Sequence, residues 1–322
     1  MRQPNVFTLA ETRLSRRRLL SASTAIASSG LAVLGAERLV GRGGSAFAQD
    51  ATPAQARQTG PSVKVVSPAS GQQITSKNID VTVEVKNFTL DCSKSGRPDE
   101  KGIGHIHAMI DGMSMAQLTN FYCDKTFTIP GDGLAPGKHT LIIALATNTH
   151  APLMETAQKV EIDYQPANPV PLPEGNYTGQ PSVGLVSPGD GATVSPKFTV
   201  EVKPVNFKPT EALEGKGNVP GYGHYHVFVD TPMNGMGMMA MSTPMAGKEA
   251  TPGGAMSDKQ MMSMAGMVAM PGSNSFELDL SAWGPGKHTI WIEPVQDDHT
   301  MFKDFGHVEF IVVVDENATP VS

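Results

Sequence analysis

The chain has 322 residues, and at roughly 150 residues per domain this length predicts two domains. It contains 33 Gly and 25 Pro, while 17% of its residues are charged and 6% are aromatic. This balance favours short strands and turns, and it excludes long coiled coils and extended disorder. After residue 48 the chain carries 18 Lys and Arg against 29 Asp and Glu, which excludes nucleic acid as a natural partner of its surface.

Residues 1–48 have the organisation of an export signal. A basic stretch containing Arg16 and Arg17 precedes a mildly apolar run, and the small residues Ala46 and Ala48 follow. The SRRRLL sequence resembles a twin-arginine signal, and we expect cleavage after Ala48. A membrane anchor is the alternative, but the run is shorter and more polar than the roughly 20 apolar residues of a membrane span. We therefore expect a mature chain without a transmembrane span, located in the periplasm, outside the cell or at its surface.

The remainder of the chain contains an internal repeat. The segments GIGHIHAMID and LAPGKHTLII match GYGHYHVFVD and WGPGKHTIWI further along, with about 30 extra residues between the motifs of the second copy. A repeat on this scale indicates two related domains. The predicted regions are a flexible polar segment (49–61), domain 1 (62–164), a Pro-rich linker (165–180), domain 2 (181–315) with a Met-rich insertion (231–274), and a tail (316–322).

Each copy consists of short segments in which apolar and polar residues alternate. Val81, Val83 and Val85, for example, alternate with polar residues, and Gly/Pro turns separate this segment from its neighbours. Such alternation is typical of half-buried strands in a β-sandwich. We predict an all-β fold made of two tandem immunoglobulin-like β-sandwich domains.

The order of motifs resembles an exported bacterial immunoglobulin-like "domain of unknown function" family, with SPxxG, GHxH, PGxHT and HxP in that order. His105, His107, His139 and His150 fit this order in the first copy, and the second copy fits until His299, where HTM replaces HxP. The resemblance implies the fold and export, and it implies no established activity.

Eight of the nine histidines form matched pairs between the copies. In a strand, residues i and i+2 point to one face, so His105 and His107 project together, away from the apolar face that forms the core. The loop with His150 is expected at the same end of the sandwich, whereas His139 is expected at the other end in a structural role. The candidate metal ligands are therefore His105, His107, His150, His224, His226 and His299.

Three imidazoles that converge on a surface depression are typical of zinc or copper sites. Two alternatives remain: the histidines are hydrogen-bonded residues of the fold, or they form a proton-sensitive surface.

Twelve of the 18 methionines lie between Thr231 and Asn274, in a stretch without Leu, Ile or Phe. Thioethers are soft ligands suited to Cu(I) or Ag(I), and the stretch resembles Met-rich segments of exported bacterial copper-handling proteins. The alternatives are a hydrophobic packing or partner-binding segment and an oxidant-scavenging or adhesive loop. The candidate soft ligands are Met109, Met233, Met236, Met238, Met239, Met241, Met245, Met256, Met261, Met262, Met264, Met267 and Met270.

Cys92 and Cys123 occur only in the first copy, on either side of the HxH segment. In an oxidising compartment we expect them to form a disulfide, and a thiolate copper site is the alternative.

Together these features predict an exported metal-binding protein that buffers or delivers copper, with zinc as the alternative metal. Its other partners would be an exported protein or the cell envelope. The competing hypothesis is a structural or adhesive cell-surface protein without metal.

We expect no enzyme, because the sequence has no GxSxG motif, paired catalytic carboxylates or phosphate-binding loop. A copper-dependent redox activity is the third hypothesis, since an HxH strand in a β-sandwich resembles copper/zinc superoxide dismutase, whose bridging-histidine and zinc-loop patterns are absent here.

Overall fold

The computed structural model describes residues 60–175, 179–231 and 264–318. In the first copy, two short 3-10 helices, η1 (Cys92–Lys94) and η2 (Met115–Gln117), accompany nine strands. The strands are β1 (Ser62–Ser67), β2 (Gln72–Ile74), β3 (Ile79–Lys86), β4 (Thr89–Leu90), β5 (Ile103–Ile110), β6 (Leu118–Tyr122), β7 (Thr126–Ile129), β8 (Gly137–Thr147) and β9 (Pro152–Tyr164).

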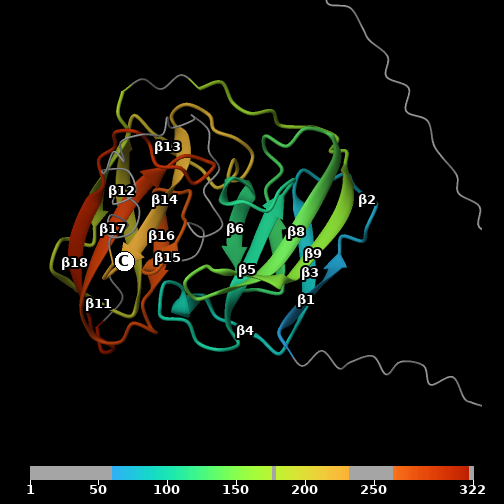
Figure 1. Cartoon of the computed structure of the whole chain (residues 1–322). Coiled ribbons are helices and arrows are strands. Elements are labelled where there is room, and N and C mark those ends of the chain that lie inside the picture. Colours follow the sequence, from blue (N-terminus) through green and yellow to red (C-terminus); the bar gives the residue numbers. More distant parts are fainter. Residues whose placement is uncertain (1–59, 176–178, 232–263, 319–322) are drawn as a thin grey trace, which may run out of the picture. The chain divides into compact units, whose positions relative to one another are not determined.

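The second copy repeats this order, and Figure 1 draws it in yellow to red after the blue to green of the first copy. Its described strands are β10 (Ser182–Ser187), β11 (Ala192–Val194), β12 (Lys197–Val205), β13 (Lys208–Pro209), β14 (Tyr222–Val229), β15 (Met267–Ala269), β16 (Ser275–Asp279), β17 (Gly286–Val295) and β18 (Val308–Val314).

Each copy folds into two sheets. In the first, β1, β3 and β7 form one sheet, while the other has the order β2-β9-β8-β5-β4, with β6 also paired to β5. The first two strands lie at the edges of different sheets: β1 runs antiparallel to β3 in one sheet, and β2 runs parallel to β9 in the other. The second copy has the same arrangement, with β10-β12-β16 facing β11-β18-β17-β14-β13 and with β15 paired to β14. The predicted fold is thus confirmed as two tandem immunoglobulin-like β-sandwiches, called here the first and second sandwich.

The alternation along the strands places the core between the two sheets of each sandwich. Val81 and Val83 of β3 and Ile106 of β5 are buried in the core of the first sandwich, and Tyr225 and Val227 of β14 are buried in that of the second. Because neighbouring side chains on a strand point in opposite directions, the histidines of β5 and β14 lie on the outer face of their sheets.

A third apolar cluster covers this outer face. It joins Met109, Leu118 and Ile142 of the first sandwich to Phe228 and Met267 of the second, all of them buried. Backbone hydrogen bonds accompany it, because the Gly266 N–H donates to the Gly96 carbonyl at 2.8 Å. The faces that carry the histidines are therefore covered by the other sandwich instead of by solvent.

The predicted insertion at 231–274 includes residues that belong to the second sandwich. Strand β15 pairs with β14 as β6 pairs with β5, so Met267 stands where the first copy has Leu118. Residues 232–263, which contain most of the predicted Met-rich stretch, lie outside the described residues, as does the predicted signal at 1–48.

Cys92 and Cys123 form a disulfide that links η1 to the segment after β6. In the described part of the chain, no helix is long and apolar enough to cross a membrane.

Candidate metal centres

Strands β5 and β14 supply the first two histidines of each candidate site. His105 and His107 point to the same face of β5, and His224 and His226 do so on β14. The glycine before each pair has a steric role: a Cβ atom on Gly104 would lie 2.0 Å from the carbonyl oxygen of Ala146. The GHxH pattern therefore combines close strand packing with two imidazoles on one face.

The third histidine comes from the turn after β8 or β17. His150 and His299 have positive φ values of 65° and 64°, a backbone conformation that residues other than Gly seldom adopt. Each closes its turn, as the His150 N–H donates to the Thr147 carbonyl and the His299 N–H to the Gln296 carbonyl. The replacement of HxP by HTM in the second copy thus leaves the position of its histidine unchanged.

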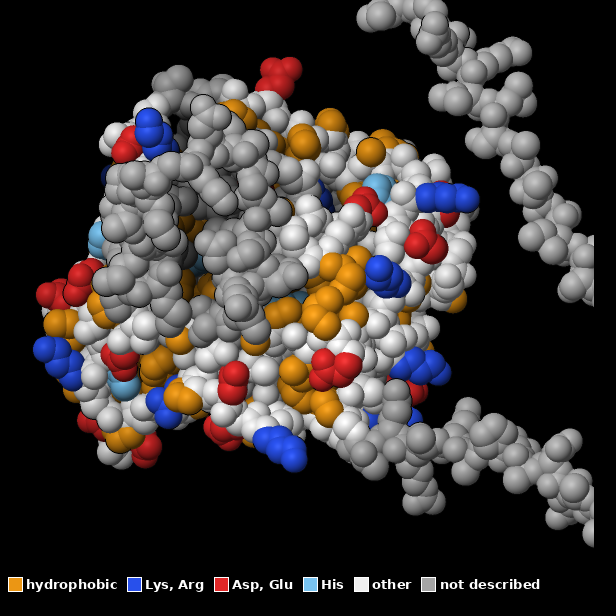
Figure 2. Space-filling model, viewed as in Figure 1, with side chains coloured by type: hydrophobic (Ala, Val, Ile, Leu, Met, Phe, Trp, Pro, Cys, Tyr) orange, Lys and Arg blue, Asp and Glu red, His pale blue; other side chains and the backbone are white. Residues whose placement is uncertain are grey.

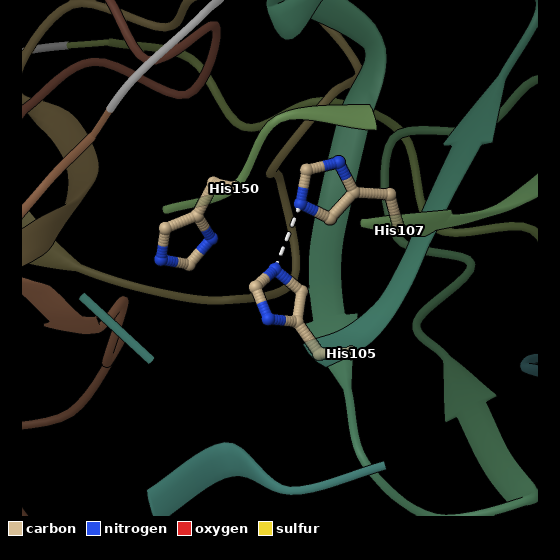
Figure 3. A group of neighbouring side chains, drawn as sticks. All are labelled: His105, His107 and His150. Atoms are coloured by element: carbon tan, nitrogen blue, oxygen red, sulfur yellow. Dashed lines mark hydrogen bonds between the residues drawn. The ribbon is translucent and has the colours of Figure 1, made fainter. Parts of the chain in front are cut away.

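In the first sandwich, His105, His107 and His150 form a cluster that we call triad 1 (Figure 3). Their three candidate ligand nitrogens lie within 4.8 Å of one another. The Nε2 atoms of His105 and His107 are 3.1 Å apart, and the rings of His105 and His150 have centroids 4.4 Å apart.

Triad 2 consists of His224, His226 and His299. The Nδ1 atom of His299 is 3.0 Å from His224 Nε2 and 3.3 Å from His226 Nε2. When a tetrahedral metal holds nitrogens at 2.0–2.1 Å, these nitrogens are about 3.3 Å apart. The spacing in both triads therefore fits a first-row metal ion at the centre.

The third histidine of each triad also contacts the opposite sandwich. His150 Nε2 donates to the Met267 carbonyl at 2.9 Å, and His299 Nε2 donates to the Leu118 carbonyl at 2.8 Å. Because a carbonyl only accepts, Nε2 carries the proton and Nδ1 of the neutral ring keeps its lone pair. Such outer hydrogen bonds orient imidazole ligands in metal sites.

Burial keeps the imidazoles in the form that binds metal. All six are buried, and on the face drawn in Figure 2 histidine side chains show only in small isolated areas. Desolvation lowers the pKa of His107 to about 3 and that of His150 to about 4, and it lowers the pKa values of the other four as well. The prediction of a surface depression was wrong, because each sandwich covers the outer face of the other.

The two triads lie close enough to affect each other electrostatically. After desolvation and His150, the charge of His299 further lowers the pKa of His107. In the same way, His150 contributes to the lowered pKa of His226, after desolvation and His299. Both triads therefore belong to one buried region between the sandwiches.

Three acidic side chains that the sequence did not single out surround triad 2. Glu214 Oε1 lies 3.8 Å from His224 Nδ1, with both side chains fully buried, and Glu293 on β17 is directly opposite His226 on β14. Asp297, two residues before His299, is also fully buried. Alignment of the copies gives a signal for Glu214, because it precedes the HxH pair by the same interval as Ser95.

Burial makes these carboxyls reluctant to ionise. Desolvation raises the pKa of Glu293 and of Asp297 to about 7 and that of Glu214 well above its usual range. Both oxygens of Glu214 have no hydrogen-bond partner. Lys216 is the nearby base, and its ammonium is hydrogen-bonded to the Pro130 and Ala212 carbonyls. Triad 2 thus has buried acidic groups near it, and not all of their oxygens have hydrogen-bond partners.

His139 and His288 lie outside the triads and have a different environment. His139 Nδ1 bonds the Asp111 carboxyl at 2.6 Å, and its Nε2 bonds the Ala135 carbonyl at 2.8 Å. His288 makes the equivalent bonds to Asp230 and Gly284. With both ring nitrogens occupied, these histidines tie the end of a strand to the neighbouring turn.

The candidate soft ligands fall into two groups. Met109, Met267 and Met270 are buried in the apolar cluster between the sandwiches, and Met264 packs against it. The others lie outside the described residues: Met233, Met236, Met238, Met239, Met241, Met245, Met256, Met261 and Met262. Three further methionines that the sequence did not single out, Met113, Met115 and Met154, are near His107.

Fold and site together define a chain of two tandem immunoglobulin-like sandwiches, each with a buried three-histidine cluster suited to a metal ion. No protein-family model and no curated protein matches this chain, so the family resemblance of its motifs stays a prediction.

Solved structures with similar folds include fibronectin(III)-like modules of Clostridium thermocellum CbhA, at 12% identity over 78% of this chain and 93% of that one, with a TM-score of 0.23. The D00–D0 domain of intimin matches at 9% identity over 78% and 98% of the two chains, with a TM-score of 0.20. A tetra-tandem repeat from the extending region of a large adhesion protein matches at 11% identity over 80% and 50%, also with a TM-score of 0.20.

Proposed function

We propose that this protein is an exported copper-binding protein that buffers or delivers the metal through its two histidine triads. The observation that carries the proposal is the convergence of three neutral imidazoles in each sandwich. The ring nitrogens that contact each other within a triad are 3.0–3.3 Å apart. Nitrogens of this kind and spacing are the ligand set of zinc and copper sites.

A purely structural role explains the triads poorly. His139 illustrates a structural histidine in this fold, because both of its ring nitrogens are hydrogen-bonded. In the triads, by contrast, the buried Nδ1 atoms of His105, His150, His224 and His226 have no hydrogen-bond partner. Buried polar atoms without partners destabilise a fold by about 1–3 kcal/mol each, and a metal ion would recruit the free lone pair of His150.

The thioethers nearby favour copper over zinc. In the first sandwich, the ring of Phe121 packs against His105 and His150, with centroid distances of 4.8 and 4.9 Å. The repeat places Met270 at the corresponding position of the second sandwich, buried and near triad 2. Copper accepts imidazole together with thioether, whereas zinc prefers nitrogen, oxygen and thiolate ligands.

Export is supported by the disulfide between Cys92 and Cys123, since disulfides persist in oxidising compartments. The twin-arginine-like segment around Arg16 and Arg17 also supports export. We propose a binding protein without enzymatic activity, and a cell-surface structural protein without metal is the alternative that the following experiment tests.

The test is metal analysis of the mature chain purified from its native compartment, together with Cu(II) and Zn(II) titration after chelation. We expect two triad-bound ions per chain, with copper retained in preference to zinc and with nitrogen hyperfine coupling in the Cu(II) EPR spectrum. The control is His307→Ala, because His307 is exposed and belongs to neither triad. A chain that binds neither metal at the triads would favour the structural alternative.

A further inference from the structure

All four methionines in the described residues of the first sandwich line a single small pocket. Met109 comes from β5, Met113 and Met115 from the turn and 3-10 helix that follow it, and Met154 from β9. The cavity is about 10 Å³ in volume, which is room for one ion or water molecule. His107 of triad 1 forms part of its wall. We call this cavity the methionine pocket.

Ordinary packing does not account for this gathering of thioethers. The positions are up to 45 residues apart in the sequence, so no local pattern brings them together. At the corresponding positions of the second copy, Phe228 replaces Met109 and Lys303 replaces Met154, whereas Met262 and Met264 keep the methionines at positions 113 and 115. The fold therefore requires neither a thioether nor, at the Met154 position, an apolar residue. The sandwiches share the triad, but only the first has all four methionines of the pocket.

The surroundings of the pocket match a soft cation of low charge. Thioethers are neutral donors that favour Cu(I) and Ag(I) over harder divalent ions. Around triad 1 the buried residues that correspond to the acidic groups of triad 2 are uncharged, namely Ser95, Ala144 and Asn148. Met154 is 48% exposed, so at least one thioether of the pocket is accessible from solvent.

We propose that the methionine pocket binds a soft monovalent cation, Cu(I) or its analogue Ag(I), and that His107 is shared between this site and triad 1. An ion bound by thioethers at the outer end exchanges ligands at His107 and moves inward to His105 and His150. The oxidation state does not change, because only metal–ligand bonds are exchanged. This transfer step rests on the metal-binding function proposed for triad 1, whereas binding in the pocket does not.

The test is titration of the full mature chain with Ag(I), which needs no reductant, followed by NMR of 13C-labelled methionine methyl groups. We expect the methyl signals of Met113, Met115 and Met154 to shift on binding. The methyl signal of Met301, two residues from His299, reports on Ag(I) at triad 2 and so distinguishes binding there from binding in the pocket. Because each methyl is read separately, methionines at 233–262 that also bind Ag(I) do not obscure the result.

Substitution with leucine sharpens the test, since leucine preserves volume and apolar character but cannot coordinate the ion. The triple variant M113L/M115L/M154L should keep its melting temperature within a few degrees and should lose at least tenfold in affinity for Ag(I) at the pocket, read from the Met109 methyl. If Ag(I) shifts none of the pocket methyls in the native chain, the proposal is overturned, whatever the triads bind.

A second variant separates this proposal from the proposed function. His105→Ala should weaken Cu(II) binding at triad 1 while the pocket methyls still respond to Ag(I). If the pocket responds but the triads of the native chain bind no Cu(II), the pocket site stands, and both the transfer step and the proposed function fail. If His105→Ala abolishes the response of the pocket while the fold is retained, an independent outer site is disproved.

Discussion

The two sandwiches contain the same histidine triad in different electrostatic surroundings. Triad 2 lies beside three buried carboxyls: Glu214, Glu293 and Asp297. The corresponding residues beside triad 1 are neutral: Ser95, Ala144 and Asn148. The copies have thus kept the three histidines and changed the charge at these positions around them.

The direction of that difference follows from the cost of burying charge. Buried carboxylates without partners are strongly destabilising. Lys216 supplies one nearby positive charge, but its ammonium donates its hydrogen bonds to the Pro130 and Ala212 carbonyls and not to a carboxylate. A divalent ion at triad 2 would supply two charges next to Glu214, with the carboxylate orienting His224 as in other metal sites. Around triad 1 the corresponding positions are uncharged, and the nearby carboxylate is that of Asp99, which acts on His150. Under the proposal above, the adjoining methionine pocket is the feature that suits a monovalent ion.

The largest expected effect is the loss of one site when a ligand is removed. His226→Ala should reduce Cu(II) affinity at triad 2 by more than about 100-fold. This is a larger loss than the 10–100-fold that is typical when a residue hydrogen-bonded to a metal ligand is removed, because here a ligand itself is lost. His107→Ala should impair triad 1 to a similar degree, and each variant should retain one metal ion per chain by elemental analysis. Loss of both ions in either variant would show that the triads act as one site.

Parity along the HxH strand was enough to predict which histidines share a face, and the loop after the PGxHT strand was enough to bring His150 and His299 to them. The burial of the triads was not predictable in the same way, because it depends on Leu118 and Met267, contributed by the opposite sandwich. Glu293 is recognisable only through its register with His226, which the sequence does not specify.

The metal-free chain should respond to acid differently in its two halves. Below pH 6.5 the unfolded chain binds protons at its histidines, whereas the buried imidazoles do not, so stability falls as the pH falls. At pH 5.5 the loss is about 1.4 kcal/mol each for His107 and His150, because their pKa values of about 3 and 4 in the folded chain lie well below that pH. Glu293 and Asp297, with pKa values raised to about 7, act in the opposite sense, as does Glu214, whose pKa burial raises well above its usual range. Below pH 7 they are protonated in the folded state but ionised in the unfolded chain, so stability rises as the pH falls.

We therefore expect the free energy of unfolding of the chelated chain, measured with urea, to fall less between pH 7.5 and pH 5.5 than that of a variant without the Glu293 and Asp297 carboxyls. The double variant E293A/D297N, which copies residues of the first sandwich, should show a steeper fall, because it removes two of the compensating carboxyls. An unchanged slope in this variant would indicate that the two groups do not titrate between folded and unfolded states as described.

A smaller effect is expected from the residue next to His224. Glu214→Ser gives triad 2 the residue found beside triad 1, and it should weaken Cu(II) or Zn(II) binding there by about 10- to 100-fold without loss of the site. Competition titration against a chelator of known affinity measures this change. The matched control, Ser95→Ala, should leave the affinity of triad 1 unaltered, since a hydroxyl carries no charge to lose. Equal losses in both variants would remove the electrostatic distinction between the sites.

The smallest difference between the copies is expected at the structural histidines. His139→Ala removes hydrogen bonds to Asp111 and to the Ala135 carbonyl, and His288→Ala removes the equivalent pair, so each should destabilise the chain by about 1–3 kcal/mol. Because these residues lie outside the triads, metal stoichiometry should stay at the native value in both variants. Thermal unfolding and metal analysis of the same samples test the two expectations together. If either variant lost an ion while keeping its melting temperature, a ligand would lie at the PGxHT end of the sandwich, and the assignment of His150 and His299 as third ligands would fail.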